Sequence, residues 1–460
     1  MDPDEFSRIS KFFLDRDQET PEQSLARRAL QRVVVVCGAD VAHSYTLQLA
    51  LLTVAKTANR CFPNGVRVII DKSLEKSHFL TDQFSSRTLM RELQLELGYD
   101  PVIESLDSEV GTINHTFILG DVPQACGLRI TFDGWIAKVG PTSLVSRLPE
   151  REYCPLVGIT AGALAVSEIF LEFAQVNIEA GSRVVTLSLW RPDLEPFDSA
   201  ALGVPLEILP SRAWILGLGH LGQGYLWALA TLPYATRDNV EFFLNDFDRA
   251  VAANVETGVL LKKRDIGKFK TRVCARWLER RGFKARLVER RFGTKFRCDP
   301  SEPQISFCGF DNNVARRALG TAEFSRVVES GLGGTLGNFD VINIHTLPGT
   351  RNVNELWPDE TTSEAESIAT NNSAYQDLAD ECGRIMLAGK AIAVPFVGAT
   401  AGTLVVAEAL RMLHGGPSFA QLKLRLGSPS VATAVLPGSY GSVDVGGLGH
   451  VPAHVLFQST

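Results

Sequence analysis

The chain has 460 residues, more than one hydrophobic core usually holds, so we expect two or three domains. Hydrophobic residues make up 45% and charged residues 21% of it, as in ordinary globular proteins, and the net charge of -6 argues against a dedicated nucleic-acid-binding protein. The eight cysteines form no C-x-x-C pair, which disfavours a disulfide framework and a cysteine-based zinc site and indicates a reducing, cytoplasmic compartment. The most apolar stretch, 213–233, is interrupted by glycines, and the amino terminus lacks a signal core, so we expect no membrane segment.

Apolar runs of strand length alternate with helical stretches along the first 200 residues, and the same series returns in the second half. Such alternation predicts a parallel sheet with crossover helices. The clearest match joins residues 157–168 to 397–408, where eight of twelve positions are identical in a pattern of small residues. The sequence therefore predicts an internal duplication with a linker near 205–211. Three further pairs of runs match upstream: 33–38 with 214–217, 66–71 with 240–246, and 117–121 with 307–311.

The two copies differ in the residues that follow their first predicted strand. The second copy has Gly217-Leu-Gly219-His-Leu-Gly222, whereas the first has Gly38-Ala-Asp40. Phosphates need a closely approaching backbone, which side chains on this turn obstruct. We therefore expect an inactive α/β domain over residues 1–200 and an active one over residues 201–460.

The glycines of the second copy lie between a predicted strand, 213–216, and a predicted helix, 225–231. In this context Gly217, Gly219 and Gly222 predict a nucleotide bound at the amino terminus of a helix. The glycines alone suit NAD, FAD or ATP equally, so the residues that follow them decide the chemistry.

Those following residues do not suit a dehydrogenase. Asp246 ends the strand at 240–244 and is expected to bind ribose hydroxyls, although a helix cap or a surface acid is the alternative. Lys270 stands three residues after a glycine at a helix start, where it can place a charge on phosphates or face solvent. Asp311 follows the strand at 304–308, where a carboxylate can hold magnesium or cap the next helix. Together they indicate ATP and magnesium beside a carboxylate, and hence adenylation.

In their order and spacing, these residues resemble the ThiF/MoeB/ubiquitin-activating-enzyme superfamily. The matching segments are Gly217 to Gly222, Asp246-Phe-Asp248, Asn254, Gly267-Lys-Phe-Lys270 and Asp311-Asn312. The resemblance implies two Rossmann-like ThiF-type α/β domains with mainly parallel sheets, paired as a pseudo-dimer within one chain. It also implies that the nucleotide is bound by the three glycines, Asp246, Asp248, Asn254, Lys270 and Asp311. Asp311 would hold Mg²⁺, and Lys270 and Asp311 would serve catalysis.

By the same resemblance, the enzyme adenylates the C-terminal glycine of a ubiquitin-like protein with ATP, passes it to its own cysteine as a thioester, and delivers it to a ubiquitin-conjugating-like enzyme. The compact chain resembles bacterial activating enzymes encoded beside such partners, with an implied role in antiviral defence. This interpretation needs no nucleic-acid or membrane partner and leaves a further homodimer open. Two alternatives stay open: adenylation of a peptide or tRNA without a thioester, and a scaffold that has lost catalysis.

The sequence departs from the family pattern in two respects. Thr257 stands where the family has an arginine for a phosphate, and the candidate substitutes are Lys262, Lys263 and Arg264. In dimeric relatives a separate arginine near the amino terminus of one copy reaches the ATP of the other; by this resemblance Arg8 and Arg16 are candidates for it, with a solvated charge as the alternative. The zinc-binding cysteine pairs of some relatives are absent, so we expect no structural zinc.

The acyl-accepting cysteine of such relatives lies in the crossover segment, here 345–390, whose one cysteine is Cys382. Arg384 would lower the pKa of that thiol and the adjacent acids would raise it, so a nucleophile and a structural thiol are both open. Cys298 is a more distant candidate. The glycine- and serine-rich extension, 428–460, is expected to form strands or a partner-binding segment. Three other cysteines look structural: Cys37 and Cys308 in strands, and Cys274 in a helix.

Overall fold

The computed structural model describes residues 5–81, 88–97, 103–105, 115–122, 126–195, 198–358, 372–375, 381–429, 433–435 and 449–454. Each half of the chain is built on one mixed sheet. The first sheet has the order β3-β2-β1-β4-β5-β6-β7. The first five strands pair in parallel, β6 pairs antiparallel with β5, and β7 pairs antiparallel with β6. Its strands are β1 (Val33–Cys37), β2 (Val66–Ile70), β3 (Ile103–Ser105), β4 (His115–Leu119), β5 (Leu128–Asp133), β6 (Ile136–Pro141) and β7 (Val185–Ser188).

The second sheet repeats this plan and adds one strand at its edge. Its order is β11-β10-β9-β12-β13-β14-β15-β16, so that each of the first seven strands corresponds to one strand of the first sheet. The duplication expected from the sequence is therefore present strand for strand. The strands are β9 (Arg212–Leu216), β10 (Glu241–Asn245), β11 (Lys284–Val288), β12 (Ile305–Cys308), β13 (Arg326–Leu332), β14 (Val341–Leu347), β15 (Gln421–Arg425) and β16 (Thr433–Val435).

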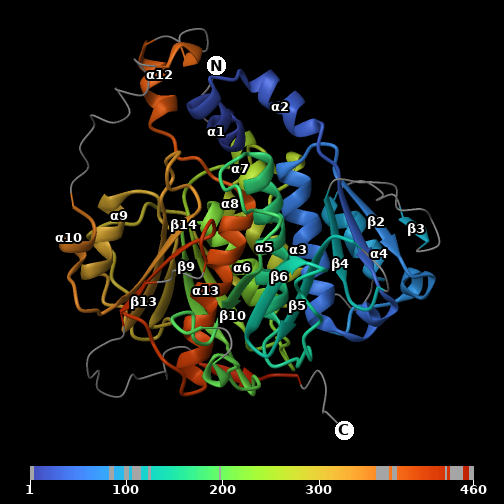
Figure 1. Ribbon diagram of the computed structural model, residues 1–460. Helices are drawn as coiled ribbons and strands as arrows, with labels where there is room; N and C mark the ends of the chain where they lie inside the picture. The colour runs from blue at the N-terminus through green and yellow to red at the C-terminus, as the bar shows by residue number, and fades with distance from the viewer. Residues whose placement is uncertain are drawn as a thin grey trace.

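Four helices lie between the two sheets and join the halves (Figure 1): α3 (Tyr45–Cys61), α5 (Leu156–Phe173), α6 (His220–Ala230) and α13 (Pro395–Leu413). Their small residues allow backbones to approach closely: a Cβ on Gly158 would lie 2.1 Å from the carbonyl oxygen of Thr46. Thr160 Oγ1 donates to Thr403 Oγ1 at 2.9 Å across the junction. By length and composition α5 and α13 could cross a membrane, but 89% of the apolar window of each is buried inside the protein, as in core helices.

The amino-terminal helices α1 (Arg8–Asp17) and α2 (Pro21–Ala29) lie at one end of the molecule, beside the crossover helix α12 (Glu381–Ala388) (Figure 1). A small apolar cluster joins α1 to the crossover, with Leu14 packed against Tyr375 and Leu387. Asn372 Nδ2 donates to the carbonyl oxygen of Leu14 at 2.8 Å. A segment of the second half therefore rests on the first helix of the chain.

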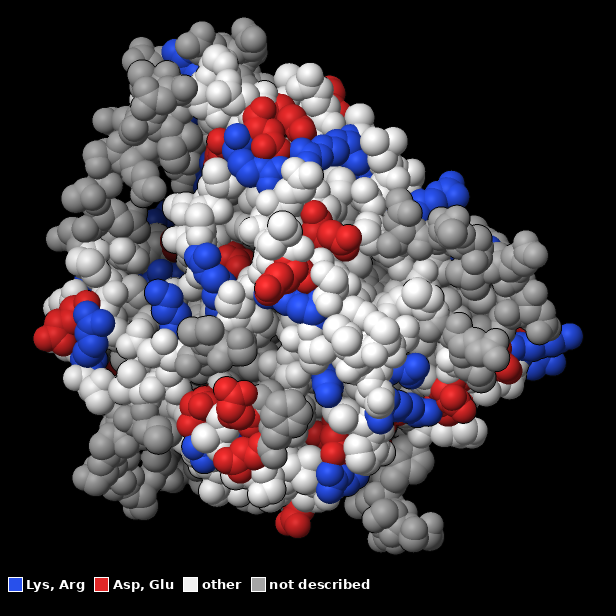
Figure 2. Space-filling model, viewed as in Figure 1, with Lys and Arg blue, Asp and Glu red and all other residues white. Residues whose placement is uncertain are grey.

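The remaining helices and strands place the polar residues and connect the sheets. The linker contains β8 (Ile208–Pro210), which pairs with β17 (His450–Pro452). The expected strands of the extension are confirmed for β16 and β17. On the face drawn in Figure 2, acidic and basic side chains are interspersed, as suits a chain with a small net charge. The other helices are α4 (Leu89–Leu97), α7 (Ala252–Thr257), α8 (Lys270–Glu279), α9 (Asn313–Ala318) and α10 (Val353–Leu356), with short 3-10 turns at Ala39–His43 and Lys263–Asp265.

Candidate active site

The glycine-rich turn of the second half joins β9 to α6, and its glycines have different structural roles. Gly217 has a positive φ of 80°, which favours glycine. A Cβ on Gly222 would lie 1.9 Å from the carbonyl oxygen of Gly217, so this position must lack a side chain for the turn to close. A Cβ on Gly219 would meet nothing within 4 Å. Gly219 therefore leaves open space before the first N–H groups of α6, where a phosphate can approach.

Asp246 follows β10 and supports this turn. Its side chain is 6% exposed; Oδ2 accepts from the N–H of Leu218 at 2.7 Å and Oδ1 from the N–H of Asp248 at 2.8 Å. Burial raises the pKa of this carboxyl, and the nearby Lys270 ammonium partly offsets the effect. Asp246 is thus neither a surface acid nor a helix cap. Each oxygen can accept a second hydrogen bond, so the expected ribose contact stays available.

Lys270 begins α8 and is buried, with 8% of its surface exposed, so it is not on a solvated helix face. Its Nζ lies 3.1 Å from Oδ2 of Asp248, whose side chain is half exposed. Because Asp248 is half exposed, an anion can approach this ion pair from the Asp248 side and compete with the carboxylate for Lys270. Asn254 Oδ1 accepts from the N–H of Val251 at 3.1 Å and so caps its own helix, α7.

Asp311 lies at the end of β12, next to the glycine-rich turn. A Cβ on Gly217 would lie 3.1 Å from the carbonyl oxygen of Gly309, two residues before Asp311. The Asp311 carboxylate is exposed, with a weak contact of 3.4 Å from Asn312 Nδ2, while Asn312 itself caps α9. An open carboxylate suits Mg²⁺, which commonly takes one or two carboxylates together with phosphate oxygens and water. The described residues contain no cluster of three or more metal-ligating side chains, and the magnesium role of Asp311 stays a prediction.

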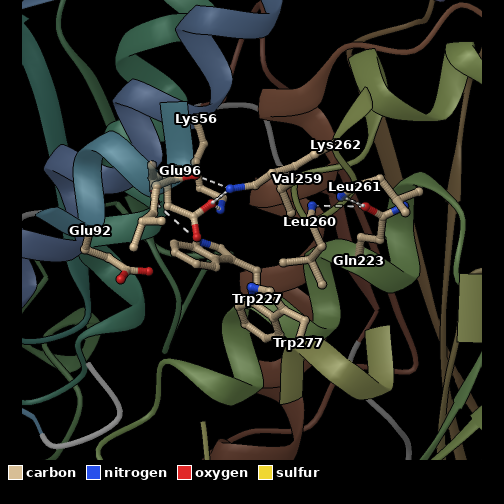
Figure 3. Close-up of polar contacts among 12 residues, drawn as sticks. Lys56, Glu92, Glu96, Gln223, Trp227, Val259, Leu260, Leu261, Lys262 and Trp277 are labelled. Atoms are coloured by element: carbon tan, nitrogen blue, oxygen red, sulfur yellow. Dashed lines mark hydrogen bonds and ion pairs between the residues drawn. The ribbon is translucent and has the colours of Figure 1, made fainter. Parts of the chain in front are cut away.

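Gln223 is a buried residue of the site that no sequence pattern indicated (Figure 3). Its Oε1 accepts from the N–H groups of Leu260 and Leu261 at 3.0 and 3.1 Å, and its Nε2 donates to the carbonyl oxygen of Leu218 at 3.2 Å. One side chain therefore ties the glycine-rich turn to the loop that follows α7.

Arg60 of the first half also holds this loop. Its Nε donates to the carbonyl oxygens of Val255 and Gly258 at 3.2 and 3.0 Å, and a terminal nitrogen donates to that of Leu261 at 3.2 Å. Thr257 is 3% exposed and donates to the carbonyl oxygen of Ala253 at 3.1 Å, facing its own helix. The first half thus shapes the loop that follows Thr257, the position at which the family arginine is missing.

The two arginines that could reach across from the first half and the candidate substitute Lys262 are placed differently. Ser7 Oγ donates to Glu256 Oε2 on α7 at 2.6 Å, and the N–H of Ile9 approaches the same oxygen at 3.4 Å. Arg8 lies between these two residues and is thereby brought beside α7. Arg16 is not brought there, because it forms a fork with Asp17 and stacks on Phe12 and Phe13. Lys262 donates to the carbonyl oxygen of Leu95 and so points to the first half.

A buried cluster beside Asp311 was likewise missed. Glu329 on β13 is fully buried; Arg316 Nε lies 2.9 Å from its Oε1 and His345 Nδ1 lies 2.9 Å from its Oε2. Arg316 Nε also donates to the carbonyl oxygen of Phe310 at 3.0 Å. The position of Arg316, five residues after Asp311, is the one signal in the sequence that could have indicated this cluster. The cluster holds the loop on which Asp311 lies.

The two cysteine candidates differ in what the structure says of them. Cys382 lies in α12, but its side chain is outside the described residues. Cys298 is buried and its thiol contacts the carbonyl oxygen of Pro303 at 3.4 Å. Burial raises the pKa of Cys298 to about 11, which leaves little thiolate at neutral pH. Cys37, Cys274 and Cys308 are buried in the elements expected for them.

In the first half, carboxylates of the chain itself occupy the corresponding crevice. Asp40 Oδ1 accepts from the N–H of Asp121 at 2.8 Å. At the start of α3, Glu152 Oε1 accepts from Ser44 Oγ at 2.5 Å and from the N–H of Thr46 at 3.4 Å. These fixed negative charges stand where the second half has open glycines, and they disfavour a bound phosphate.

Comparison with known proteins agrees with this architecture. The BilD N-terminal domain family matches residues 32–189, and the BilD C-terminal domain family matches residues 209–416. The chain is 35% identical over 429 residues to the bacterial E1-like protein BilD of Collimonas sp. (strain OK412), covering 91% of both chains.

Two solved structures are more distant. E. coli MccB with MccA-N7isoASN is 16% identical, with a TM-score of 0.34 over 51% of this chain and 66% of that chain. E. coli tRNA N6-threonylcarbamoyladenosine dehydratase, TcdA, is 16% identical, with a TM-score of 0.30 over 45% of this chain and 86% of that chain. The expected relation to the ThiF/MoeB/ubiquitin-activating superfamily is confirmed, and the chain belongs to the BilD family of E1-like proteins.

Proposed function

We propose that the chain uses ATP to adenylate the C-terminal glycine of a ubiquitin-like protein. The observation that carries the proposal is the meeting of the glycine-rich turn, the Asp248–Lys270 pair and Asp311 at the carboxyl edges of β9, β10 and β12. Ligands of α/β sheets bind at this edge. The membership in an E1-like family supports the same chemistry.

In this proposal, a carboxylate oxygen of the glycine attacks the α-phosphorus of ATP. The bond from that phosphorus to the bridging oxygen breaks, and its electron pair leaves with pyrophosphate. Lys270 offsets the negative charge that builds on the phosphates, because a fixed cation costs no reorganisation during the reaction. Asp246 orients the ribose, and Gly219 lets the phosphates approach the N–H groups of α6. Asp311 would hold Mg²⁺, which when bound neutralises charge on the phosphate chain.

The second proposed step is transfer to Cys382. The sulfur attacks the acyl carbonyl, AMP leaves, and the thioester is passed to a ubiquitin-conjugating-like enzyme. The crossover that contains Cys382 rests on α1, whose first turn contacts α7 at Glu256. These contacts link the crossover through α1 to α7, the helix that contains Asn254, and support the proposed transfer. Cys382→Ala should keep AMP–glycine formation and lose the thioester, measured on non-reducing gels; thioester formed by that variant would contradict the assignment.

The setting of the reaction is also part of the proposal. The seven cysteines whose side chains the structure describes are free thiols, in keeping with a reducing, cytoplasmic compartment. Adenylation of a peptide or tRNA by the same fold stays an alternative, and the missing arginine at Thr257 keeps a catalytically lost scaffold as another. The first alternative predicts pyrophosphate exchange that depends on a peptide or tRNA and needs no ubiquitin-like protein. The second predicts ATP binding without exchange.

ATP–pyrophosphate exchange with the ubiquitin-like protein encoded nearest to this gene tests the proposal. Asp311→Ala should abolish exchange, because the carboxylate that fits Mg²⁺ is removed. Asp121, the exposed residue at the corresponding edge of the first sheet, provides the matched control, and Asp121→Ala should leave exchange unchanged. Equal rates in the two variants would contradict the assignment of the active half.

A further inference from the structure

A second hollow lies between the halves, away from the nucleotide crevice. It is a cavity of about 300 Å³ bounded by α4 of the first half and by α8 and the loop 260–268 of the second. Lys262 and Arg264, two candidate substitutes for the missing arginine, line it, but the three glycines, Asp246, Asp248, Asn254, Lys270 and Asp311 do not. Its walls hold three acidic side chains, Glu92, Glu96 and Asp265, and twice as many cations, namely Lys262, Arg264, Lys268, Arg276, Arg280 and Arg281.

The three carboxylates already have cationic partners. Glu96 pairs with Lys56, and Arg281 lies 3.6 Å from its other oxygen; Figure 3 shows Lys56 and Lys262 converging on Glu96. Burial alone would raise the pKa of Glu96, but these cations hold it well below its usual value. Glu92 pairs with Arg281 at 3.0 Å and Asp265 with Lys268 at 3.0 Å.

Three arginines of the cavity, Arg264, Arg276 and Arg280, form no ion pair with any residue that the structure describes. Arg276 and Arg280 are one turn apart on α8, where like charges repel. The negative end of the α8 dipole accounts for a cation at Arg280, but not for Arg264, which comes from a separate 3-10 turn. The lining therefore carries an excess of positive charge that the residues described by the structure do not neutralise.

We propose that this cavity binds a small oligophosphate anion, either free or as the phosphate chain of a nucleotide. One planar guanidinium group can bind two phosphate oxygens at once, and three arginines without an ion-pair partner among the described residues line this cavity. The volume suits a small molecule rather than a peptide or a nucleic-acid helix. The loop that carries Arg264 and Lys268 continues directly into Lys270 of the nucleotide site. This site is separate from the ATP site of the proposed function and does not depend on it.

Calorimetric titration of the full chain with inorganic tripolyphosphate tests the proposal. Lys270→Ala weakens the nucleotide site and should retain one tripolyphosphate site. Arg276→Ala/Arg280→Ala should weaken that remaining site at least about tenfold when placed in the Lys270→Ala background. The matched control is Arg272→Ala in the same background, because Arg272 is exposed on α8, is paired with Glu289, and does not line the cavity.

Further arms separate the sources and the competing class of ligand. GTP that binds the Lys270→Ala protein more tightly than tripolyphosphate would assign the phosphates to a nucleotide, and weaker binding would assign a free anion. Affinity should fall as NaCl rises from low to physiological concentration. Loss of all binding in Lys270→Ala, equal binding in the double-arginine and Arg272 variants, or tighter binding of hexaglutamate would overturn the proposal.

Discussion

Two glycines of one motif should respond in opposite ways to the addition of a single methyl group. In Gly222→Ala the new Cβ would lie 1.9 Å from the carbonyl oxygen of Gly217, which is backbone and cannot swing aside. Overpacking of this kind costs about 1–3 kcal/mol or more. In Gly219→Ala the new Cβ meets nothing within 4 Å and φ is -73°, so stability should change by less than about 0.5 kcal/mol.

Nucleotide binding should show a different pattern from stability. The open space at Gly219 is where we place the approaching phosphates, so Gly219→Ala should weaken ATP binding at least about tenfold, or 1.4 kcal/mol. Urea unfolding gives the stability of both variants, and calorimetric titration with a non-hydrolysable ATP analogue gives the affinity. Normal ATP affinity in Gly219→Ala, or full stability in Gly222→Ala, would refute the roles assigned to the two glycines.

Two further perturbations test the contacts around the turn. Burial of the His220 imidazole lowers its pKa to about 4, while the unfolded chain titrates near 6.5, so the unfolded state binds the extra proton and stability falls as pH drops. Between pH 7 and 5 this protonation should lower the free energy of unfolding by about 1–2 kcal/mol, allowing for partial exposure of the side chain. His220→Gln keeps an acceptor for the N–H of Gly398 and should flatten this pH dependence of the free energy, measured by urea unfolding. Arg60→Ala leaves four carbonyls of the second half without their donor and should cost about 2–4 kcal/mol, with Arg60→Lys intermediate. An unchanged pH profile, or an Arg60→Ala protein as stable as the wild type, would contradict these assignments.

The sheet plan could be predicted because it depends on local and repeated patterns. Parallel strands buried on both faces are continuous apolar runs, and two such series in the same order predict two sheets of the same order. The identity between 157–168 and 397–408 marks α5 and α13, whose small residues pack at the junction. Element ends were less accurate: α6 begins at His220 rather than Tyr225, because Gly222 lies inside its first turn and against Gly217.

The candidate ligands were predictable because they follow strands that lie side by side. Gly217 and Asp246 come directly after strands of the second sheet, and Asp311 comes three residues after the end of β12; neighbouring parallel strands bring their carboxyl ends together. Their roles in nucleotide binding stay predictions until ligand binding is measured.

The supporting contacts could not be predicted, because their partners are far apart in the chain. Arg60 contacts a loop that lies about 200 residues further along the chain, and nothing in the sequence around Arg60 distinguishes it from other basic residues in helices. Gln223 looks like a polar interruption of an apolar helix until Leu260 and Leu261 are placed against it. Such contacts depend on how segments far apart in the chain pack together, which periodicity and propensity do not encode.

The central claim is that this chain forms a mixed anhydride between AMP and a protein carboxylate. Intact-protein mass spectrometry of the ubiquitin-like protein, after incubation with the enzyme, ATP and magnesium, tests it most directly. The Cys382→Ala enzyme should be used so that the adduct accumulates, with a substrate lacking its C-terminal glycine as the control. We predict a mass increase of one adenylyl group on the intact substrate and none on the shortened one. An unmodified substrate despite ATP binding, or equal modification of both substrates, would contradict the account.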